Sequence, residues 1–430
     1  MLIRIKKLFA TDLVKVSLLN GISTLIKMVT SFVSVKVVAV LIGPSGIALL
    51  GQLNNFTTIF LNLSTGFVNG GVTKYISEYN GEESKYAPIL RTGLWLTIIL
   101  SGLCAFVMII GAGYFATEIL KDVHYRPIFI IFGCTILFYA LNILLLSVIN
   151  GFKEFRKYVT INIVTSVTGL IFSIVLALTF GVYGALISAV TFQSVVFIIT
   201  LYIALNSKWF KWSLFLGKFS RESAVKLSHF FLMALVSALT VPGSQLAIRG
   251  YIIKHHSITD AGLWEGMLRI SNLYLMVITT SLSVYYLPRL SELKTQRELR
   301  KEVVSVYRII IPFIAVLFLT IFICKNIIIS ILFDEKFSAI KDLFLFQLIG
   351  DFFKVAAWVL AYQLLAKAMT RLYILTEVLS SLVYVGVGIF FVSIYGNIGA
   401  TIGYAISFFI YFIVMVVIFR KLLFNPKKTD

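Results

Sequence analysis

Apolar runs of about 20 residues recur from one end of this chain to the other, and this feature most strongly constrains its fold. Each run can cross roughly 30 Å of hydrocarbon as a helix that rises about 1.5 Å per residue. Strands that cross a bilayer would instead show alternating runs of about ten residues. The 430 residues are 59% hydrophobic and 13% charged, too apolar for a water-soluble core. The sequence therefore predicts an all-α polytopic membrane protein.

The apolar runs predict about twelve spans. They are expected near residues 13–41, 47–72, 88–112, 127–149, 159–179, 184–205, 224–249, 261–285, 303–323, 342–365, 372–394 and 398–419. The first run lacks a small-residue cleavage pattern, so we expect a retained helix rather than a signal peptide. Cys104, Cys134 and Cys324 all fall inside apolar runs without metal or disulfide spacing, so we expect core residues.

The formal net charge of +19 is distributed as in a membrane protein and not as in a nucleic-acid-binding surface. With the N-terminus in the cytoplasm, the segments on the inner side hold 23 of the 38 Lys and Arg residues, and the outer loops hold six. This asymmetry predicts a multi-pass protein of the bacterial inner membrane with both termini in the cytoplasm. The other nine lie within or at the ends of spans.

Short motifs recur at a constant offset of half the chain. Gly-Val-Tyr-Gly-Ala at 181–185 is followed 215 residues later by Gly-Asn-Ile-Gly-Ala at 396–400. We expect a parallel duplication of six-helix lobes, at 1–205 and 224–430. The segment 206–223 between them combines Lys, Arg and Trp and is expected to be an amphipathic linker on the anionic cytoplasmic leaflet.

Polar side chains form stripes along the first, second, seventh and eighth spans, at steps of three and four residues. Asn55, Asn62 and Asn69 belong to the stripe of the second span, and Asn272 belongs to that of the eighth. Such residues can simply join helices inside a membrane. Because the four stripes occupy corresponding positions of the two halves, we favour a water-filled cavity and predict that these amides bind substrate.

Charged residues in the spans are further candidates for the functional site. A cation near the bilayer centre costs about 2.5 to 3.5 kcal/mol on insertion scales, so such a residue is usually functional. Lys27 lies near the middle of its span without a partner on its own helix. Asp351 and Lys354 are also near mid-depth, and their spacing places them on one helix face, so a structural pair is the alternative.

A second charged group lies toward the outer side. Glu265 precedes Arg269 by four residues, a spacing that allows an ion pair, whereas Arg249 is within a turn of the boundary and can snorkel to the surface. We predict substrate-binding roles for the cations and ion-coupling roles for the carboxylates. The predicted cations are Lys27, Lys354, Arg269 and Arg249, and the predicted carboxylates are Asp351 and Glu265.

No motif typical of an enzyme is present. The sequence lacks a phosphate-binding glycine loop, a zinc HExxH motif and a nucleophile with a partner. We expect no catalysis, no cofactor, no metal and no nucleic-acid partner.

Several ordered motifs resemble those of the Wzx flippases over nearly the whole chain. These motifs are Gly43-Pro44-Ser45-Gly46, Gly70-Gly71-Val72-Thr73-Lys74-Tyr75, Leu263-Trp264-Glu265-Gly266, Ser283-Val284-Tyr285-Tyr286-Leu287-Pro288 and Gln347-Leu348-Ile349-Gly350-Asp351. The resemblance is greatest to members that carry undecaprenyl-linked enterobacterial common antigen or O-antigen. It implies the fold of the multidrug/oligosaccharidyl-lipid/polysaccharide exporter superfamily, with two six-helix lobes that form a V around a central cavity.

The resemblance also implies a substrate and partners. The substrate would be an undecaprenyl-diphosphate-linked oligosaccharide, and the partners would be membrane lipids, a polysaccharide polymerase and a chain-length regulator. We expect Lys27 and Lys354 to hold the diphosphate while the polar stripes meet sugar hydroxyls. The alternatives are a cation-coupled multidrug exporter of the same superfamily, which should prefer buried acids, and a structural scaffold or channel.

Overall fold

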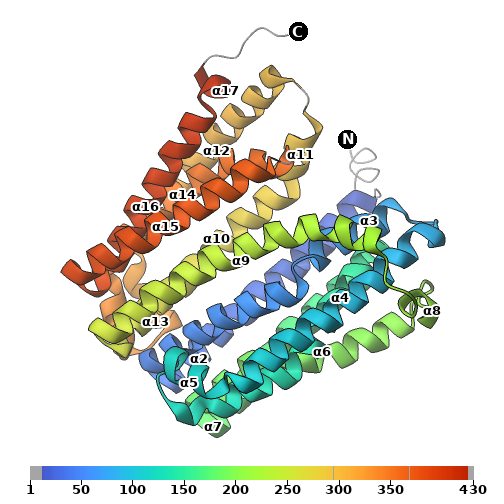
Figure 1. The fold of residues 1–430 in the computed structure, drawn as a ribbon. Helices are drawn as coiled ribbons and strands as arrows, with labels where there is room; N and C mark the ends of the chain where they lie inside the picture. Colours follow the sequence, from blue (N-terminus) through green and yellow to red (C-terminus); the bar gives the residue numbers. More distant parts are fainter. Residues whose placement is uncertain (1–11, 294, 368, 425–430) are drawn as a thin grey trace, which may run out of the picture. The chain divides into compact units, whose positions relative to one another are not determined.

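The computed structural model describes residues 12–293, 295–367 and 369–424, and its regular secondary structure within these ranges is helical (Figure 1). The longer elements, in chain order, are α2 (Asp12–Thr65), α4 (Glu83–Ile110), α6 (Arg126–Gly151), α7 (Phe155–Leu205), α9 (Arg221–His255), α10 (Ile258–Ser281), α12 (Gln296–Ile323), α14 (Phe344–Ala366), α15 (Thr370–Tyr395) and α16 (Asn397–Ile418). The shorter ones are η1 (Val68–Val72), α3 (Thr73–Glu78), α5 (Ala112–Ile119), η2 (Val123–Tyr125), α8 (Trp212–Phe215), η3 (Leu282–Tyr286), α11 (Leu287–Glu292), α13 (Lys325–Leu332), η4 (Glu335–Asp342) and α17 (Arg420–Phe424).

The chain divides into two compact units. Unit 1 comprises residues 1–42 and 53–238, and unit 2 comprises residues 43–52 and 239–430. The boundary therefore falls within α9 and not at the predicted linker 206–223, which lies in unit 1. Compact packing and internal duplication are different properties, so the predicted lobes 1–205 and 224–430 stay a prediction.

In unit 1, α6 is the central helix. It packs against α3, α4, α5 and α7, and buried apolar side chains such as Phe67, Leu90 and Leu144 fill the space between these helices. In unit 2, α16 packs against both α14 and α15, and Figure 1 shows these three helices in orange to red. Trp264 and Tyr404 are buried in the core of that unit.

The order and length of the elements in the first half recur in the second. A five-residue π-helical turn and a six-residue helix, η1 and α3, are matched by η3 and α11. The 28-residue α4 and the eight-residue α5 are matched by the 28-residue α12 and the eight-residue α13. Agreement in type, order and length supports the internal duplication.

Two pairs of glycines, one in each half of the chain, share the same backbone geometry. Gly181 has φ 57° and ψ −134°, and Gly396, 215 residues later, has φ 59° and ψ −137°. A second glycine, Gly184 or Gly399, follows each of them by three residues. A Cβ added to Gly184 would lie 1.8 Å from the carbonyl oxygen of Leu176, and a Cβ added to Gly399 would lie 2.0 Å from the carbonyl oxygen of Phe391. Each half thus has a glycine with positive φ at the break between two helices and, three residues later, a second glycine where the backbone approaches closely.

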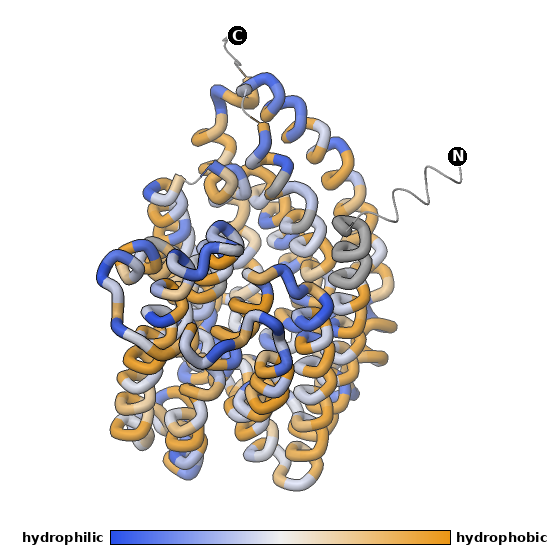
Figure 2. The backbone as a smooth tube through the Cα atoms, turned by 90° about the vertical axis from the view of Figure 1, so that its right-hand side faces the viewer, coloured by the Kyte–Doolittle hydropathy of each residue, from blue (hydrophilic) through white to orange (hydrophobic). Residues whose placement is uncertain are grey.

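Nine helical stretches of the described ranges are long and apolar enough to cross a membrane. Two of them, Gly21–Glu78 and Phe155–Leu205, run for 58 and 51 residues, and each contains a glycine with non-helical angles, Gly43 or Gly181. Each is long enough for two crossings. With α10, whose charged residues lower its hydropathy, this agrees with the prediction of about twelve spans. Figure 2 shows predominantly apolar colouring along the long helices.

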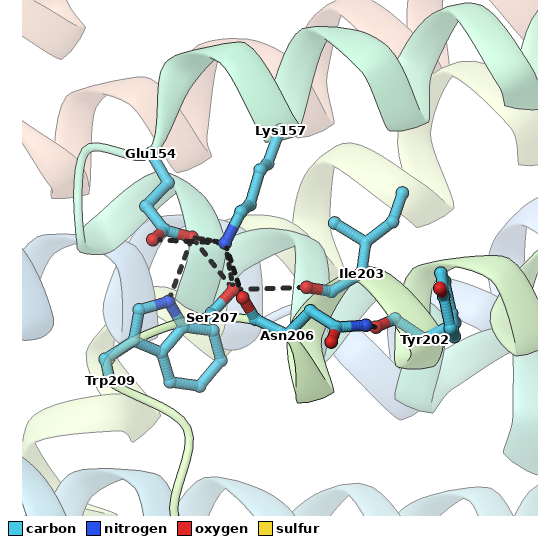
Figure 3. Close-up of polar contacts among 7 residues, drawn as sticks. All are labelled: Glu154, Lys157, Tyr202, Ile203, Asn206, Ser207 and Trp209. Atoms are coloured by element: carbon cyan, nitrogen blue, oxygen red, sulfur yellow. Dashed lines mark hydrogen bonds and ion pairs between the residues drawn. The ribbon is translucent and has the colours of Figure 1, made fainter.

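The segment after α7 is held to unit 1 by a polar cluster (Figure 3). Glu154 forms an ion pair with Lys157 at 3.2 Å and accepts hydrogen bonds from Ser207 at 3.0 Å and from Trp209 Nε1 at 3.2 Å. Further along, Leu214 and Phe215 are buried while Trp212 is 60% exposed. The linker therefore has one face in the core and one face outward.

Candidate functional site

Asp351 is fully buried in α14 and is surrounded by hydrogen-bond donors. Its oxygens accept from Ser271 Oγ at 2.7 Å, from Tyr404 OH at 2.6 Å and from Gln347 Nε2 at 3.4 Å, and also from the hydroxyl of Tyr274. These donors come from α10, α14 and α16. These donors give the buried carboxylate the hydrogen-bond partners that water would otherwise supply.

Lys354 lies one turn further along α14, on the same face as Asp351. Its Nζ donates to Tyr404 OH at 3.0 Å, and it lies 5.2 Å, 5.4 Å and 5.0 Å from the ring centroids of Trp358, Tyr404 and Phe408. No direct ion pair joins it to Asp351 among the described residues. The structural pair considered from the sequence is thus replaced by a bridge through one tyrosine hydroxyl.

Both the lysine and a further carboxylate line a cavity of about 420 Å³ inside unit 2. The further carboxylate is Glu377 of α15, whose Oε1 accepts from Tyr411 OH at 3.2 Å. Asn272, a residue of the polar stripe in the eighth predicted span, also lines this cavity. The polar and aromatic lining is completed by Thr240, Ser244, Gln245, Thr279, Trp358, Ser380, Ser381, Tyr384, Tyr404, Ser407, Phe408 and Tyr411.

Sequence reasoning missed Glu377, Tyr404 and Trp358. A single carboxylate in the apolar run 372–394 was a usable signal, because an ionisable residue in a span is usually functional. The roles of Tyr404 and Trp358 had no such signal, because aromatic residues are common throughout the spans.

The second charged group is also built within unit 2. Glu265 accepts from Arg269 Nε at 3.1 Å, as the spacing predicted, and forms an ion pair with Arg249 through its other oxygen. Arg249 additionally donates to Gln52 Oε1 at 3.3 Å and lies 5.3 Å from the ring centroid of Trp264. The prediction that Arg249 snorkels to the surface is wrong, because its side chain is 0% exposed.

The predicted substrate-binding residues of unit 1 make fewer polar contacts with other described residues. Lys27 is exposed on α2. Asn62 donates from Nδ2 to the carbonyl of Thr58 at 2.9 Å on its own helix, whereas the buried Nδ2 of Asn55 has no hydrogen-bond partner among the described residues. The side chain of Asn69 lies outside the part that the structure describes. Substrate binding by these four residues stays a prediction.

Comparison with known proteins now adds to these observations. Residues 50–342 match the model of a family described as polysaccharide biosynthesis protein. The chain is 29% identical over 401 residues to the lipid III flippase of Escherichia coli (strain K12), covering 93% of this chain and 96% of that protein. A lipid III flippase of Shigella flexneri matches to the same extent.

Solved structures show the same fold at lower identity. The lipid II flippase MurJ in an inward closed conformation has a TM-score of 0.71 and 16% identity, over 95% of this chain and 87% of that one. An inward-facing multidrug resistance MATE family transporter of the MOP superfamily also has a TM-score of 0.71 and 16% identity, over 94% and 96%. These findings confirm the all-helical transporter fold and the resemblance predicted from the ordered motifs. The family match covers more than half of the sequence, and the chain is a member of the polysaccharide biosynthesis protein family.

Proposed function

We propose that this protein is a flippase that moves an undecaprenyl-diphosphate-linked oligosaccharide, of the O-antigen or enterobacterial common antigen type, from the cytoplasmic to the periplasmic leaflet. The observation that carries this proposal is the similarity to lipid III flippases along 93% of the chain. Translocation of such a lipid makes and breaks no bond, so the protein would act as a transporter and not as an enzyme.

The physical task explains the polar groups in the spans. A diphosphate and a sugar chain lose their hydration in hydrocarbon, so the protein must supply replacement partners. Lys27 is an exposed cation within an apolar helix, and it would hold the diphosphate. The amides of the polar stripes would bind sugar hydroxyls, while the polyprenyl tail stays in lipid. Movement would follow by alternating access between inward-open and outward-open states.

The distribution of Lys and Arg supports an orientation with both termini in the cytoplasm of the inner membrane. In this orientation the substrate enters from the leaflet where it is made. A polysaccharide polymerase and a chain-length regulator would then be the partners that use the delivered glycan.

A multidrug exporter is the second candidate, because a MATE transporter shares the fold equally well. Sequence similarity along the full chain favours the flippase. Measuring drug susceptibility and glycan delivery in the same strain distinguishes the two functions, because an exporter would lower drug susceptibility without delivering glycan.

The test is delivery of lipid-linked glycan in a bacterial strain that lacks its own flippase. We expect wild type to restore periplasmic glycan, and we expect Lys27→Ala to lower delivery about tenfold or more at matched membrane levels, the size of one lost charge-assisted hydrogen bond. Lys27→Arg is the matched control, because it keeps the charge. If wild type restores none of the glycans tested, the flippase proposal is wrong; full activity of Lys27→Ala would remove only Lys27 from the mechanism.

A further inference from the structure

The cavity of unit 2 has charges that do not suit a diphosphate. Lys354 and Glu377 both line it, and Asp351 lies behind the lysine with Tyr404 between them. One cation with two carboxylates has a formal sum of one negative charge. The cavity therefore offers a diphosphate no net positive charge to bind it.

The cavity also offers hydrogen-bonding groups that the protein does not use. The side chains of Gln245, Asn272 and Ser380 line it, and none of the three makes a hydrogen bond to another described residue. Amides and hydroxyls both donate and accept. Such groups match sugar hydroxyls, which also do both, better than they match an anion that only accepts.

Lys354 and Glu377 also have hydrogen-bonding positions that the protein does not use. Lys354 uses one donor, toward Tyr404, and an ammonium has three. Glu377 accepts from Tyr411 at one oxygen, which leaves its second oxygen for a ligand hydroxyl. One donor and one acceptor from different helices fix the orientation of a polar ligand between them.

Aromatic side chains supply the remaining wall. Trp358, Tyr384 and Phe408 line the cavity, and their apolar faces suit the carbon-bound hydrogens of a pyranose ring. The volume of about 420 Å³ lies near the lower end of the roughly 300–1,000 Å³ typical of small-molecule sites. It suits a single sugar residue better than a longer glycan.

We propose that the cavity between α9, α10, α14, α15 and α16 is a binding site for one uncharged pyranose residue of the lipid-linked glycan. The proposal rests on the flippase function. In it, Lys354 acts as a hydrogen-bond donor to the sugar and replaces the diphosphate role predicted from the sequence.

The test uses the purified full-length protein in detergent and saturation-transfer NMR, with N-acetylglucosamine as the uncharged probe at up to 100 mM. We expect transfer to the sugar with wild type, no displacement by inorganic pyrophosphate, and at least a fivefold weaker signal for Glu377→Gln and for Asn272→Ala. Ser393→Ala is the matched control, because Ser393 is exposed on α15, bonds only within its own helix and does not line the cavity. Gel filtration and thermal melting verify that each variant is folded.

Three results would overturn the site: absence of transfer with wild type, displacement of the sugar by pyrophosphate, or wild-type signals from both cavity variants. Glycan delivery by the same variants separates this proposal from the flippase function. If wild type delivers glycan and both cavity variants deliver it equally well, the flippase stands and the sugar site is wrong. If wild type delivers none, the function itself is wrong even where a sugar binds.

Discussion

At the scale of single residues, the most consequential group is the buried carboxylate of Glu265 between two arginines. Arg249 is 0% exposed, and Glu265 is its ion-pair partner. Removing the carboxylate with Glu265→Ala leaves a buried guanidinium uncompensated, which is expected to destabilise the protein by about 3 to 5 kcal/mol. Thermal unfolding of the purified protein in detergent measures this loss.

The matched control for this prediction is Arg269→Ala. The Arg269 side chain is 16% exposed and shares Glu265 with Arg249, so its removal leaves the buried pair intact and should cost clearly less. A double variant, Arg249→Met with Glu265→Met, removes both buried charges and should recover much of the stability. Equal melting temperatures for Glu265→Ala and wild type would show that this pair does not stabilise the fold.

The same residues show what sequence alone can predict at this scale. The pair of Glu265 and Arg269 was visible because helical spacing is local. The partnership of Arg249 was not, because it depends on how α9 and α10 pack together. Likewise, the bridge by Tyr404 between Asp351 and Lys354 joins residues about 50 positions apart, a contact that no period in the sequence encodes.

At the scale of elements, the repeated glycines predict a graded response to added methyl groups. Gly184→Ala and Gly399→Ala would each place a Cβ within 2.0 Å of a carbonyl oxygen, so the helix start must shift. Each substitution is expected to lower stability by about 1 to 3 kcal/mol, as overpacking does, and the two effects should be similar because the geometries match. Fluorescence-detected gel filtration after heating measures both.

Gly102→Ala is the control for this pair. Gly102 lies within α4, where a Cβ would meet nothing within 4 Å, and alanine has a higher helix propensity than glycine by roughly 1 kcal/mol. We expect it to match or exceed wild type in stability. A large loss at Gly184 with none at Gly399 would argue against equivalent roles for the two glycines.

The elements themselves were the part best predicted from the sequence. Apolar runs of membrane length located the long helices, because a bilayer demands that length. The π-helical turns η1 and η3 were not predicted, since they lie inside continuous polar and apolar patterns without a distinct signal. The division of α9 between two compact units was also hidden, because it depends on packing partners and not on hydropathy.

At the scale of the whole molecule, the proposed flippase function makes one quantity decisive, the charge that crosses the membrane in one transport cycle. An inside-negative potential of 100 mV favours outward movement of each negative charge by about 2.3 kcal/mol, or roughly 50-fold in the equilibrium ratio between leaflets. Because the diphosphate of the proposed substrate carries at least one such charge, we expect flipping in proteoliposomes to depend on the sign of a potassium diffusion potential set with valinomycin.

The measurement is the share of undecaprenyl-diphosphate-linked sugar that an external enzyme can reach, with protein-free liposomes as control. A larger share under inside-negative than under inside-positive potential means that net negative charge moves outward with the lipid. Equal shares, both above the control, would mean that another charge compensates the diphosphate, and Asp351 would then be the first residue to vary as a carrier of a coupled cation. In that case translocation remains, but the field no longer drives it.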